Sequence, residues 1–459
     1  MKEKTLPRIL IGGSGSGCGK TTVVVGLLKA LMDQNKKPAA FKCGPDYIDP
    51  MFHSQVIGAK ARNLDLYMCG PDAVNFILGQ NGEEDGISVI EGVMGMFDGL
   101  SFDDPQFSAS DISLLTETPA LLVVSVKGKS ASLLAEISGY LNYYENNIKG
   151  VILNRCSKGM YPVYKKAIET HLPVKAYGYL PPMDNISIES RHLGLITSDE
   201  VEGLKEKTTL LGDTAAETLD LAGIIELASS APKLVYNEEL FACEPLTKEP
   251  VKIAVPKDKA FCFYYEENIQ LMRKLGCEIC YFSPLSDKHL PKDISAIYLG
   301  GGYPELYGEE LERNDTIRQE IKEAGLSGMP IYGECGGYMY LGKSIEHKGA
   351  THEMVGLLSG HSFMTGGLVR FGYKNLIANK DNILCKKGQA IKAHEFHYSD
   401  SDCPGSTFTS VNRRGSETEA IDENLQVLGG YPHLHFYSNM EFAVNFVSKA
   451  IEFRDSTKK

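Results

Sequence analysis

Short apolar runs alternate with stretches of helical periodicity along the first half of the chain. Runs of this kind, bounded by glycine, proline or polar residues, predict buried strands. The predicted strands are Arg8–Gly12, Pro38–Lys42, Ile87–Ile90, Ala120–Val126, Gly150–Leu153 and Val174–Tyr179. Thr21–Asn35, which places apolar residues on one face, and Ala131–Tyr144 predict helices. Such an alternation is typical of a mainly parallel sheet with helices packed against it.

The alternation lapses at residues 229–250, where several prolines and mixed charges predict a linker. It then resumes with new strands and helices. The predicted strands are Lys252–Val255, Glu278–Phe282, Ala296–Leu299 and Pro330–Tyr332, and the predicted helices are Glu267–Leu275 and Glu309–Ala324. We therefore expect two doubly wound α/β domains, residues 1–235 and 251–459, joined by a linker at residues 236–250.

Composition narrows the class of protein. The 459 residues are 43% hydrophobic and carry a formal net charge of −12, which disfavours nucleic acid or an anionic membrane as the main partner. The apolar run around Pro119–Val126 is about a strand long and cannot span a bilayer. The apolar stretch near the N-terminus is too short for a signal peptide, and the 11 cysteines are odd in number. These features predict a cytoplasmic protein with reduced thiols.

A glycine-rich segment, GGSGSGCGKTT at residues 12–22, joins the first predicted strand to the first predicted helix. Glycines let the backbone curl so that successive N–H groups point at phosphate oxygens, and a lysine can reach the β- and γ-phosphates. Ser14 stands where the strict phosphate-loop pattern has its first glycine, and a glycine comes one place earlier. The predicted ATP-binding residues of this segment are Gly13, Gly15, Gly17, Gly19, Lys20, Thr21 and Thr22.

Two acidic residues follow predicted strands in this half. Asp46 lies in FKCGPDYIDP, and Glu91 directly follows the run Ile87–Ile90. Ligands of open α/β sheets bind at the carboxyl ends of strands, and Mg²⁺ prefers carboxylate and phosphate oxygens. We therefore expect Mg²⁺ to be held by Thr21, Asp46 and Glu91, with Asp49 and Asp98 as weaker candidates.

The segment IYGECGGYMYL, residues 331–341, predicts a cysteine nucleophile. Gly333 and Gly337 flank Cys335 in a G-x-C-x-G arrangement between an apolar strand and a helix, as in a nucleophile elbow. The Gly336 N–H would face a developing oxyanion, and Gly302, in the glycine loop after another strand, is the second oxyanion candidate.

A cysteine nucleophile needs a base, and several histidines of the second half are candidates. They are His361, His394, His397, His433 and His435. In YPHLHF, His433 and His435 would face the same side of a strand, so either or both could reach the thiol. HEFH spaces its histidines three apart rather than the four of a helical zinc site, which argues against a metal there.

These motifs together resemble the cobyrinate a,c-diamide synthase family over nearly the whole chain. The resemblance is carried by FKCGPDYIDP, IEGVMGMFDG, GVILNR, RHLGL, FCFYYEEN, FSPLSD, LGGGYPELY, GECGGYMYL, HEFHYS and YPHLHF. It implies a P-loop NTPase-like, dethiobiotin synthetase-like ATP domain joined to a class I glutamine amidotransferase domain. Such an enzyme amidates the a- and c-carboxylates of a corrinoid, using glutamine or ammonia, ATP and Mg²⁺.

The resemblance also assigns roles to individual residues. Cys335 would be the glutaminase nucleophile and His433 its base. Ordinary class I glutaminases have a glutamate two residues after that histidine, and His435 stands there instead, which favours a Cys-His dyad. Asn154 would read adenine. Tyr47 and Asp98 would line the reaction cleft.

Two departures from the family pattern bear on these roles. Ser125 ends a strand where the family usually has aspartate, which removes a possible carboxylate. The region of Ser190 reads IESRHL where the family usually has proline before Glu-Arg-His-Leu.

The motifs together predict a division of labour. ATP would activate a substrate carboxylate as an acyl phosphate in the first domain, and ammonia released from glutamine in the second would displace phosphate. Three alternatives remain at this level: the same chemistry on another tetrapyrrole such as nickel sirohydrochlorin, a non-catalytic P-loop regulator, and a tetrapyrrole-binding protein without enzymatic activity. The second leaves GECGG and YPHLHF unexplained, and the third would need no GKTT.

Overall fold

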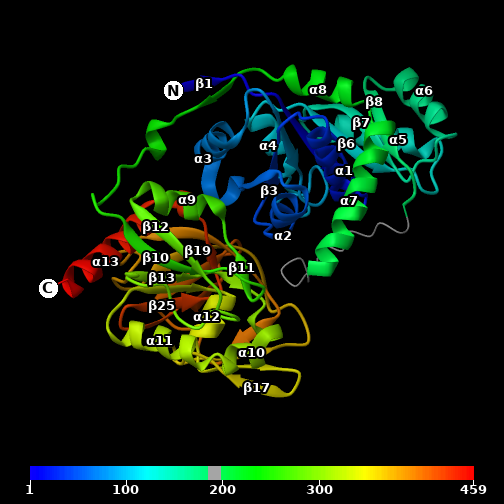
Figure 1. Cartoon of the computed structure of the whole chain (residues 1–459). Helices are drawn as coiled ribbons and strands as arrows, with labels where there is room; N and C mark the ends of the chain where they lie inside the picture. Colours follow the sequence, from blue (N-terminus) through cyan, green and yellow to red (C-terminus); the bar gives the residue numbers. More distant parts are fainter. Residues whose placement is uncertain (184–197, 459) are drawn as a thin grey trace. The chain divides into compact units, whose positions relative to one another are not determined.

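The computed structural model describes residues 1–183 and 198–458. The region of Ser190 therefore lies outside the described residues. The chain divides into two compact units, Met1–Phe241 and Ala242–Lys459 (Figure 1). Each unit is built around its own mainly parallel sheet, so the expected α/β class is confirmed.

The sheet of the first unit has seven parallel strands in the order β4-β3-β5-β2-β6-β7-β8. In chain order their bounds are Arg8–Gly13 (β2), Pro38–Cys43 (β3), Lys60–Leu64 (β4), Ile87–Glu91 (β5), Ala120–Ser125 (β6), Ile148–Asn154 (β7) and Lys175–Leu180 (β8). The six strands predicted from the apolar runs are all present. The first of them, β2, is fully buried at the centre of the sheet, so the loop that follows it lies at the middle of the carboxyl edge.

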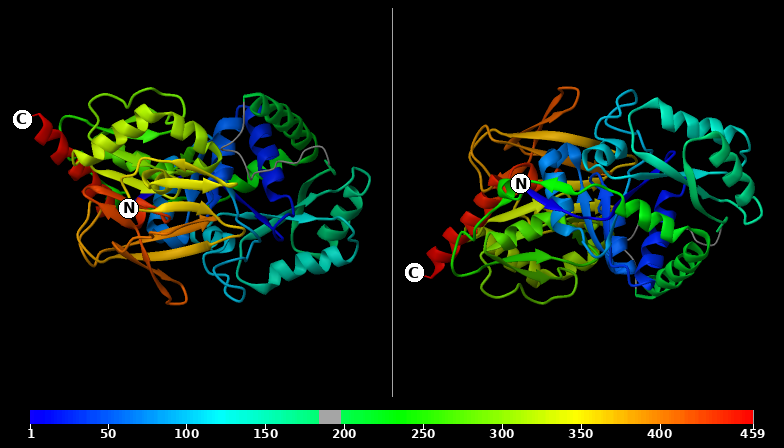
Figure 2. Two further views of the ribbon diagram at one scale, coloured as in Figure 1. Left: turned by 90° about the horizontal axis from the view of Figure 1, so that it is seen from below. Right: turned by 90° about the horizontal axis from the view of Figure 1, so that it is seen from above.

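Helices cover this sheet (Figures 1 and 2). Their bounds are Lys20–Asp33 (α1), Ile48–Phe52 (α2), Leu66–Asn81 (α3), Ala109–Leu115 (α4), Ser132–Tyr143 (α5), Tyr161–His171 (α6), Ser198–Thr218 (α7) and Leu221–Ser229 (α8), with a π-helix at His53–Ile57 (η1). Leu27 and Leu28 of α1 pack with Leu211 of α7 and Ile224 of α8 in one apolar cluster. A short antiparallel pair, β1 (Lys2–Lys4) and β9 (Leu234–Tyr236), joins the two ends of this unit.

The central sheet of the second unit has the order β12-β10-β13-β15-β25-β24, and only β24 runs antiparallel to its neighbour. The strands are Val251–Pro256 (β10), Cys277–Phe282 (β12), Ala296–Leu299 (β13), Ile331–Glu334 (β15), Asp422–Asn424 (β24) and Val427–Gly430 (β25). The helices are Glu266–Lys274 (α9), Gly308–Arg313 (α10), Asp315–Leu326 (α11), Gly336–Leu341 (α12) and Glu441–Thr457 (α13), with 3₁₀ turns at Pro304–Tyr307 (η4) and Phe436–Ser438 (η5). A further 3₁₀ turn, Glu239–Phe241 (η3), ends the first unit. The single helix predicted at residues 309–324 is wrong, because Asn314 leaves the helical conformation between α10 and α11.

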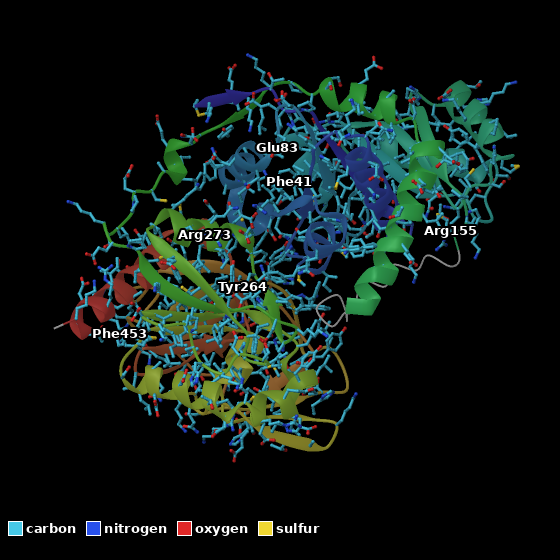
Figure 3. The ribbon with its side chains drawn as sticks, in the orientation of Figure 1. Phe41, Glu83, Arg155, Tyr264, Arg273 and Phe453 are labelled. Carbon is cyan, nitrogen blue, oxygen red and sulfur yellow. The ribbon has the colours of Figure 1, made fainter. Side chains whose placement is uncertain are left out.

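Smaller sheets complete the second unit, and most of their strands lie where the sequence pattern predicted no element. They are β11-β14 (Phe261–Phe263, Gly301–Gly302), β17-β16-β18-β21 (Ala350–Glu353, Ser344–His347, His361–Met364, Ser399–Ser401) and β23-β22-β19-β20-β26 (Glu417–Ala420, Phe408–Asn412, Arg370–Ala378, Ala390–His397, His433–Leu434). Side chains fill the interior of both units (Figure 3). Among the described residues, no helix combines the length and apolar character that crossing a membrane requires.

Candidate active site

The glycine-rich loop follows β2 and leads directly into α1. Gly15, Gly17 and Gly19 have φ of 147°, 76° and 93°, a region that side chains rarely adopt. No atom lies within 4 Å of where a side chain of Gly15 or Gly17 would begin, so the loop has open space beside it. Gly13 ends β2, and a Cβ there would lie 2.7 Å from Cys18 Sγ. The loop therefore has the form expected of a phosphate cradle.

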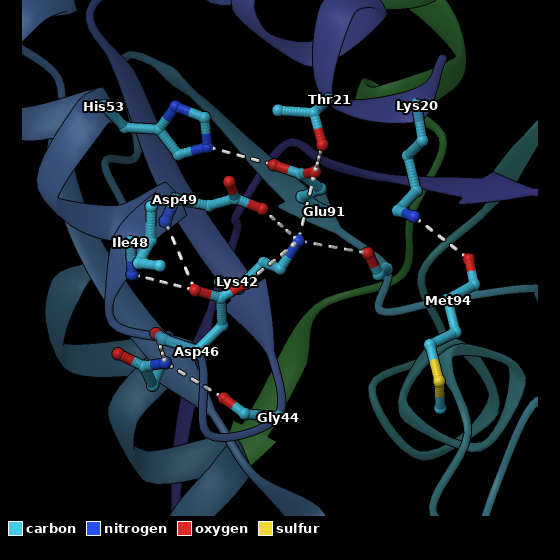
Figure 4. Close-up of polar contacts among 12 residues, drawn as sticks. Lys20, Thr21, Lys42, Gly44, Asp46, Ile48, Asp49, His53, Glu91 and Met94 are labelled. Atoms are coloured by element: carbon cyan, nitrogen blue, oxygen red, sulfur yellow. Dashed lines mark hydrogen bonds and ion pairs between the residues drawn. The ribbon is translucent and has the colours of Figure 1, made fainter. Parts of the chain in front are cut away.

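The first residues of α1 point back toward β5. Lys20 Nζ donates to the Met94 carbonyl at 3.0 Å, and Thr21 Oγ1 donates to Glu91 Oε1 at 2.7 Å (Figure 4). Thr22 continues the helix in a half-buried position. Thr21 and Glu91, which the sequence assigned to one Mg²⁺ site, are thus brought into direct contact.

A buried lysine that the sequence analysis missed organises the acidic residues around the loop. Lys42 is the fifth residue of β3, and its Nζ lies 2.5 Å from Asp49, 3.1 Å from Glu91 and 3.9 Å from Asp46 (Figure 4). His53 Nε2 lies 3.0 Å from the other oxygen of Glu91. A lysine inside an apolar strand, FKCG, was the available signal, because lysine is almost never buried unless it is paired.

Burial by itself would favour the neutral form of every member of this cluster. At Lys42, burial is outweighed by the carboxylates of Glu91, Asp49 and Asp46 together, so its pKa is raised above the ordinary value. At Glu91, burial is outweighed by Lys42 and His53, and its pKa is lowered well below the usual range. Asp49 behaves differently, because burial and repulsion by Glu91 and Asp46 raise its pKa to about 7 despite Lys42.

The donor set fits a magnesium ion that is shared with a nucleotide. The hydroxyl of Thr21 and the carboxylate of Glu91 adjoin each other beside the loop, and both are hard oxygen donors. No group of three or more His, Cys, Asp or Glu side chains within residues 1–183 and 198–458 could hold a metal by itself. Protein-bound Mg²⁺ commonly takes one or two carboxylates together with phosphate oxygens, so such a group is not required.

The other predicted residues of this unit lie on the same edge of the sheet. Asp46 accepts the N–H of Ile48 at 2.8 Å, and Tyr47 directly precedes α2. Asp98 accepts the N–H of Gly95 at 2.7 Å in the loop after β5. Ser125 ends β6 and supplies no carboxylate there.

Asn154, at the end of β7, holds the glycine-rich loop through a hydrogen bond. Its Nδ2 donates to the Cys18 carbonyl at 2.8 Å, and a Cβ on Gly19 would lie 1.8 Å from that nitrogen. The contact explains why residue 19 has no side chain. Adenine recognition by Asn154 stays a prediction.

The thiol segment forms a sharp turn between β15 and α12. Cys335 has φ 49° and ψ −106°, and its N–H donates to the Gly430 carbonyl at 2.8 Å. A Cβ on Gly337 would lie 2.3 Å from the Leu299 carbonyl oxygen, so the turn needs glycine at that position. This strained strand–turn–helix geometry is typical of a nucleophile elbow.

The two predicted oxyanion residues are neighbours beside this turn. A Cβ on Gly336 would lie 3.1 Å from the Gly302 nitrogen, and a Cβ on Gly301 would lie 2.5 Å from His433 Cε1. Tyr264, labelled in Figure 3, shapes the glycine loop, because its hydroxyl accepts the Gly300 N–H at 3.0 Å and donates to the Pro256 carbonyl at 2.6 Å.

His433 is the histidine that the fold brings to the thiol. Its imidazole is hydrogen-bonded to Cys335, and its Nδ1 lies 3.5 Å from Glu334 Oε2. Burial lowers the pKa of His433, but the hydrogen bond with Cys335 and the negative charges of Cys335 and Glu334 outweigh burial and raise that pKa to about 10. A protonated imidazole next to a thiol stabilises the thiolate, which is the nucleophilic form.

The remaining candidate histidines have other contacts in the structure. His435 follows the end of β26, where the chain turns into η5, so strand alternation does not carry it to the thiol. Its ring packs 4.8 Å from that of Tyr265, centroid to centroid. His361 Nδ1 is hydrogen-bonded to Ser344, and His397 stacks on Tyr431. His394 lies opposite His433 on β20, and burial lowers its pKa to about 3.

Comparison with known proteins gives matches for both units. Residues 9–196 match the model of the CobQ/CobB/MinD/ParA nucleotide binding domain, and residues 252–441 match that of the CobB/CobQ-like glutamine amidotransferase domain. A cobyrinate a,c-diamide synthase of Clostridium tetani is 40% identical over 446 residues, covering 96% of this chain and 99% of the relative. One from Priestia megaterium is 39% identical over 448 residues, covering 96% of each chain. One from Dehalococcoides mccartyi is 38% identical over 462 residues, covering 97% and 99%.

The two domain matches define the class of protein: a glutamine amidotransferase joined to a nucleotide-binding domain. The full-length similarity goes further, and the chain belongs to the cobyrinate a,c-diamide synthase family.

The geometry of the thiol turn leads to a stability prediction. In Gly337→Ala, the added methyl group would meet a backbone oxygen of β13, which cannot move without disturbing the sheet. We expect the free energy of unfolding to fall by about 1–3 kcal/mol, the usual range for overpacking. Alkylation of Cys335 by iodoacetamide, followed by mass spectrometry of its peptide, should slow as well.

The matched control is Gly366→Ala, because no atom lies within 4 Å of the Cβ position at Gly366. That variant should change the unfolding free energy by no more than about 0.5 kcal/mol. Equal effects of the two substitutions would contradict the packing argument.

Proposed function

We propose that this chain converts the a- and c-carboxylates of cobyrinate to carboxamides, using ATP and the side-chain nitrogen of glutamine. As a member of its family it is a glutamine-hydrolysing carbon–nitrogen ligase. The observation that carries the proposal is the hydrogen bond between Cys335 and His433 at the turn after β15, in the unit that matches a glutamine amidotransferase. The relatives compared above carry the cobyrinate name, which favours cobyrinate over nickel sirohydrochlorin.

The second unit would release ammonia from glutamine. The Cys335 thiolate attacks the amide carbon, and the N–H groups of Gly302 and Gly336 stabilise the oxyanion. His433 holds the proton of the thiol and gives it to the leaving ammonia. Water then attacks the thioester carbon, its proton passes to His433, and glutamate leaves as the thiol is restored.

The first unit would activate the acid. An oxygen of the substrate carboxylate attacks the γ-phosphorus of ATP, ADP leaves, and an acyl phosphate forms. Lys20 and the amides of the glycine loop bind the phosphates, and Lys42 adds positive charge beside Glu91. Thr21, Asp46 and Glu91 would hold Mg²⁺, which neutralises charge on the transferring phosphoryl group. Tyr47 and Asp98 would line the cleft for the tetrapyrrole.

Ammonia completes the reaction by attacking the acyl carbon, and phosphate leaves. Because free ammonia is mostly protonated at neutral pH, we infer that it reaches the acyl phosphate by a shielded route. Ammonia release and carboxylate activation are thus assigned to different units. Each step can therefore be removed by a substitution in one unit while the other step is measured.

The acceptor can be tested directly. Purified protein with ATP, Mg²⁺ and glutamine should convert cobyrinate to a product that carries two carboxamides, detected by mass spectrometry as two successive losses of one mass unit. Sirohydrochlorin and its nickel complex serve as comparison acceptors under the same conditions. Faster amidation of either comparison acceptor would overturn the assignment of cobyrinate.

Cys335→Ala should separate the two nitrogen sources. Glutamine-dependent amidation and glutamine hydrolysis should fall by at least about 10⁴-fold, because the nucleophile is gone. Amidation with added ammonium chloride should continue at the wild-type rate, because nothing in the nucleotide-binding unit changes. The control is Cys280→Ala on β12, a partly exposed thiol outside both sites. Loss of both nitrogen sources in Cys335→Ala would contradict the division of labour.

Lys20→Ala should show the reverse pattern. Amidation should stop with either nitrogen source, because phosphate binding and charge neutralisation are lost, while part of the glutaminase activity remains. Lys29→Ala is the matched control on the same helix, where Lys29 pairs with Asp33 away from the glycine-rich loop, and it should retain amidation. ADP release reports ATP use and glutamate release reports glutamine hydrolysis, so both are followed in the same reaction. Full amidation by Lys20→Ala would contradict the proposed role of the first unit.

A further inference from the structure

The position that ordinarily orients the histidine of a class I glutaminase is occupied by His435, and His435 does not serve that purpose. Its ring is completely buried, and burial lowers its pKa to about 3, so it carries no charge at neutral pH. Neither of its ring nitrogens has a hydrogen-bond partner within the described residues. The imidazole of His433 therefore needs its orienting group from elsewhere in the fold.

We propose that Glu334, the residue immediately before the nucleophile, is the positioning carboxylate for His433. Its Oε2 lies 3.5 Å from His433 Nδ1, the ring nitrogen that an orienting acid contacts in a catalytic triad. This inference rests on the proposed roles of Cys335 and His433. It replaces the expected dyad with a triad whose acid comes from a different strand than in ordinary class I glutaminases.

The surroundings of Glu334 hold it in this orientation. Its side chain is 1% exposed, and Tyr298 Oη donates to Oε2 at 3.1 Å. Tyr332 Oη and the backbone N–H of Leu434 donate to Oε1 at 3.0 and 3.1 Å. Each of these neighbours donates, so the carboxyl group accepts at both oxygens. A buried acid held by several donors is fixed in place, which is what an orienting group requires.

The segment that carries His433 is fixed by the same network. Leu434 binds Glu334 through its N–H, while its carbonyl accepts from Asn268 Nδ2 at 2.8 Å. The Asn268 Oδ1 accepts the N–H of Phe436, also at 2.8 Å. Asn268 belongs to α9. The segment that follows His433 is therefore hydrogen-bonded both to α9, through Asn268, and to β15, through Glu334.

The backbone turn explains how adjacent residues reach one imidazole. Consecutive side chains of a strand point to opposite faces. Cys335 leaves the strand conformation with φ 49°, and both its thiol and the Glu334 carboxylate interact with His433. The strained turn that exposes the nucleophile thus also places the acid beside the base.

The protonation of His433 agrees with this geometry. Burial opposes the charged imidazole, and Cys335 and Glu334 together raise its pKa to about 10. Because the folded value lies above the ordinary value near 6.5, the imidazolium predominates at every pH below about 10, including the range from about pH 6.5 to pH 10 in which an ordinary imidazole would be neutral. Removing the Glu334 charge should shrink this range from its upper end.

Other titratable groups lie around Cys335 and His433, and their protonation could also change the pH dependence of Cys335 alkylation. Those that interact electrostatically with Cys335, His433 or Glu334 are Tyr264, Tyr298, Tyr332, His394, Glu395, His397 and Tyr431. Of these, His394 and His397 have pKa values lowered to about 3 and 4 by burial, so they are neutral throughout the range tested.

The test is Glu334→Gln, which keeps the shape and removes the charge. We expect kcat for glutamine hydrolysis to fall about 10²-fold or more, with little change in KM for glutamine, as for the loss of an orienting acid. The pH dependence of Cys335 alkylation by iodoacetamide, measured from pH 6 to pH 10, should change at the upper end of the range, because His433 loses its proton at a lower pH without the Glu334 charge. Ammonia-dependent amidation should stay at the wild-type rate.

The control is His435→Phe, which keeps an aromatic ring in the packed position two residues after His433. It should retain glutaminase activity and the wild-type alkylation profile. An unchanged alkylation profile in Glu334→Gln, or an equal loss in His435→Phe, would overturn the assignment of Glu334.

A folding defect is separated from a positioning defect by circular dichroism and by a second variant. Glu334→Asp keeps the charge and shortens the reach by one methylene. It should lower kcat while keeping the wild-type pH dependence of alkylation, and wild-type kcat in this variant would overturn the proposal. None of these outcomes tests the proposed role of Cys335 as nucleophile. That role would be contradicted by a different result, glutamine use by Cys335→Ala.

Discussion

Charged groups removed from water must be matched by partners, and both candidate sites of this protein are built on that constraint. In the first unit, the Lys42 ammonium is buried among three carboxylates and stabilises the ionised form of Glu91. In the second, the Glu334 carboxylate is buried among two tyrosine hydroxyls, a backbone N–H and the His433 imidazole. Removing a charged member of either set would leave its partner charged, buried and unpaired, and this lowers the free energy of unfolding strongly.

The same constraint links structure to chemistry. The charges around Lys42 lie beside the glycine loop through the contact of Thr21 with Glu91, where phosphoryl transfer needs fixed charges. The charges around Glu334 extend through His433 to Cys335, where a thiolate is needed. In both units a parallel sheet makes this possible, because its strands end together and bring buried polar groups to one edge.

Close approach of the backbone is the second feature that the sites share. Asn154 lies against Gly19 in the first unit, and the Leu299 carbonyl lies against Gly337 in the second. At each position a side chain would displace the group that shapes the turn. The glycines therefore serve the phosphate loop and the thiol turn by leaving space, and at Gly19 also by adopting a positive φ.

Local patterning predicts the parallel sheets well and the antiparallel ones poorly. The six predicted strands of the first unit's sheet are visible in the sequence as short apolar runs, because a parallel sheet is buried on both faces. The edge strand β4, KARNL, is partly exposed, shows no such run and was not predicted. The strand Arg370–Ala378 is mostly half-buried and shows no such run. The predicted helix at 309–324 fails because its periodicity continues through Asn314, and the break there depends on the Asn314 side chain, which donates to the carbonyls of Pro284 and Asp287.

The sequence by itself determined the α/β class, the glycine loop with Lys20 and Thr21, and the glycine-framed Cys335, because each depends on residues that are adjacent in the chain. The residues alone left both His433 and His435 open as the base, the family resemblance favoured His433, and the tertiary structure brings His433 to the thiol. Only the tertiary structure decided that Lys42 joins Asp49 to Glu91 and that Glu334 lies beside His433. These are contacts between strands and loops far apart in sequence, or depend on where a strand ends. The packing of the sheets decides which of these side chains meet, and a local sequence pattern contains no information about that packing.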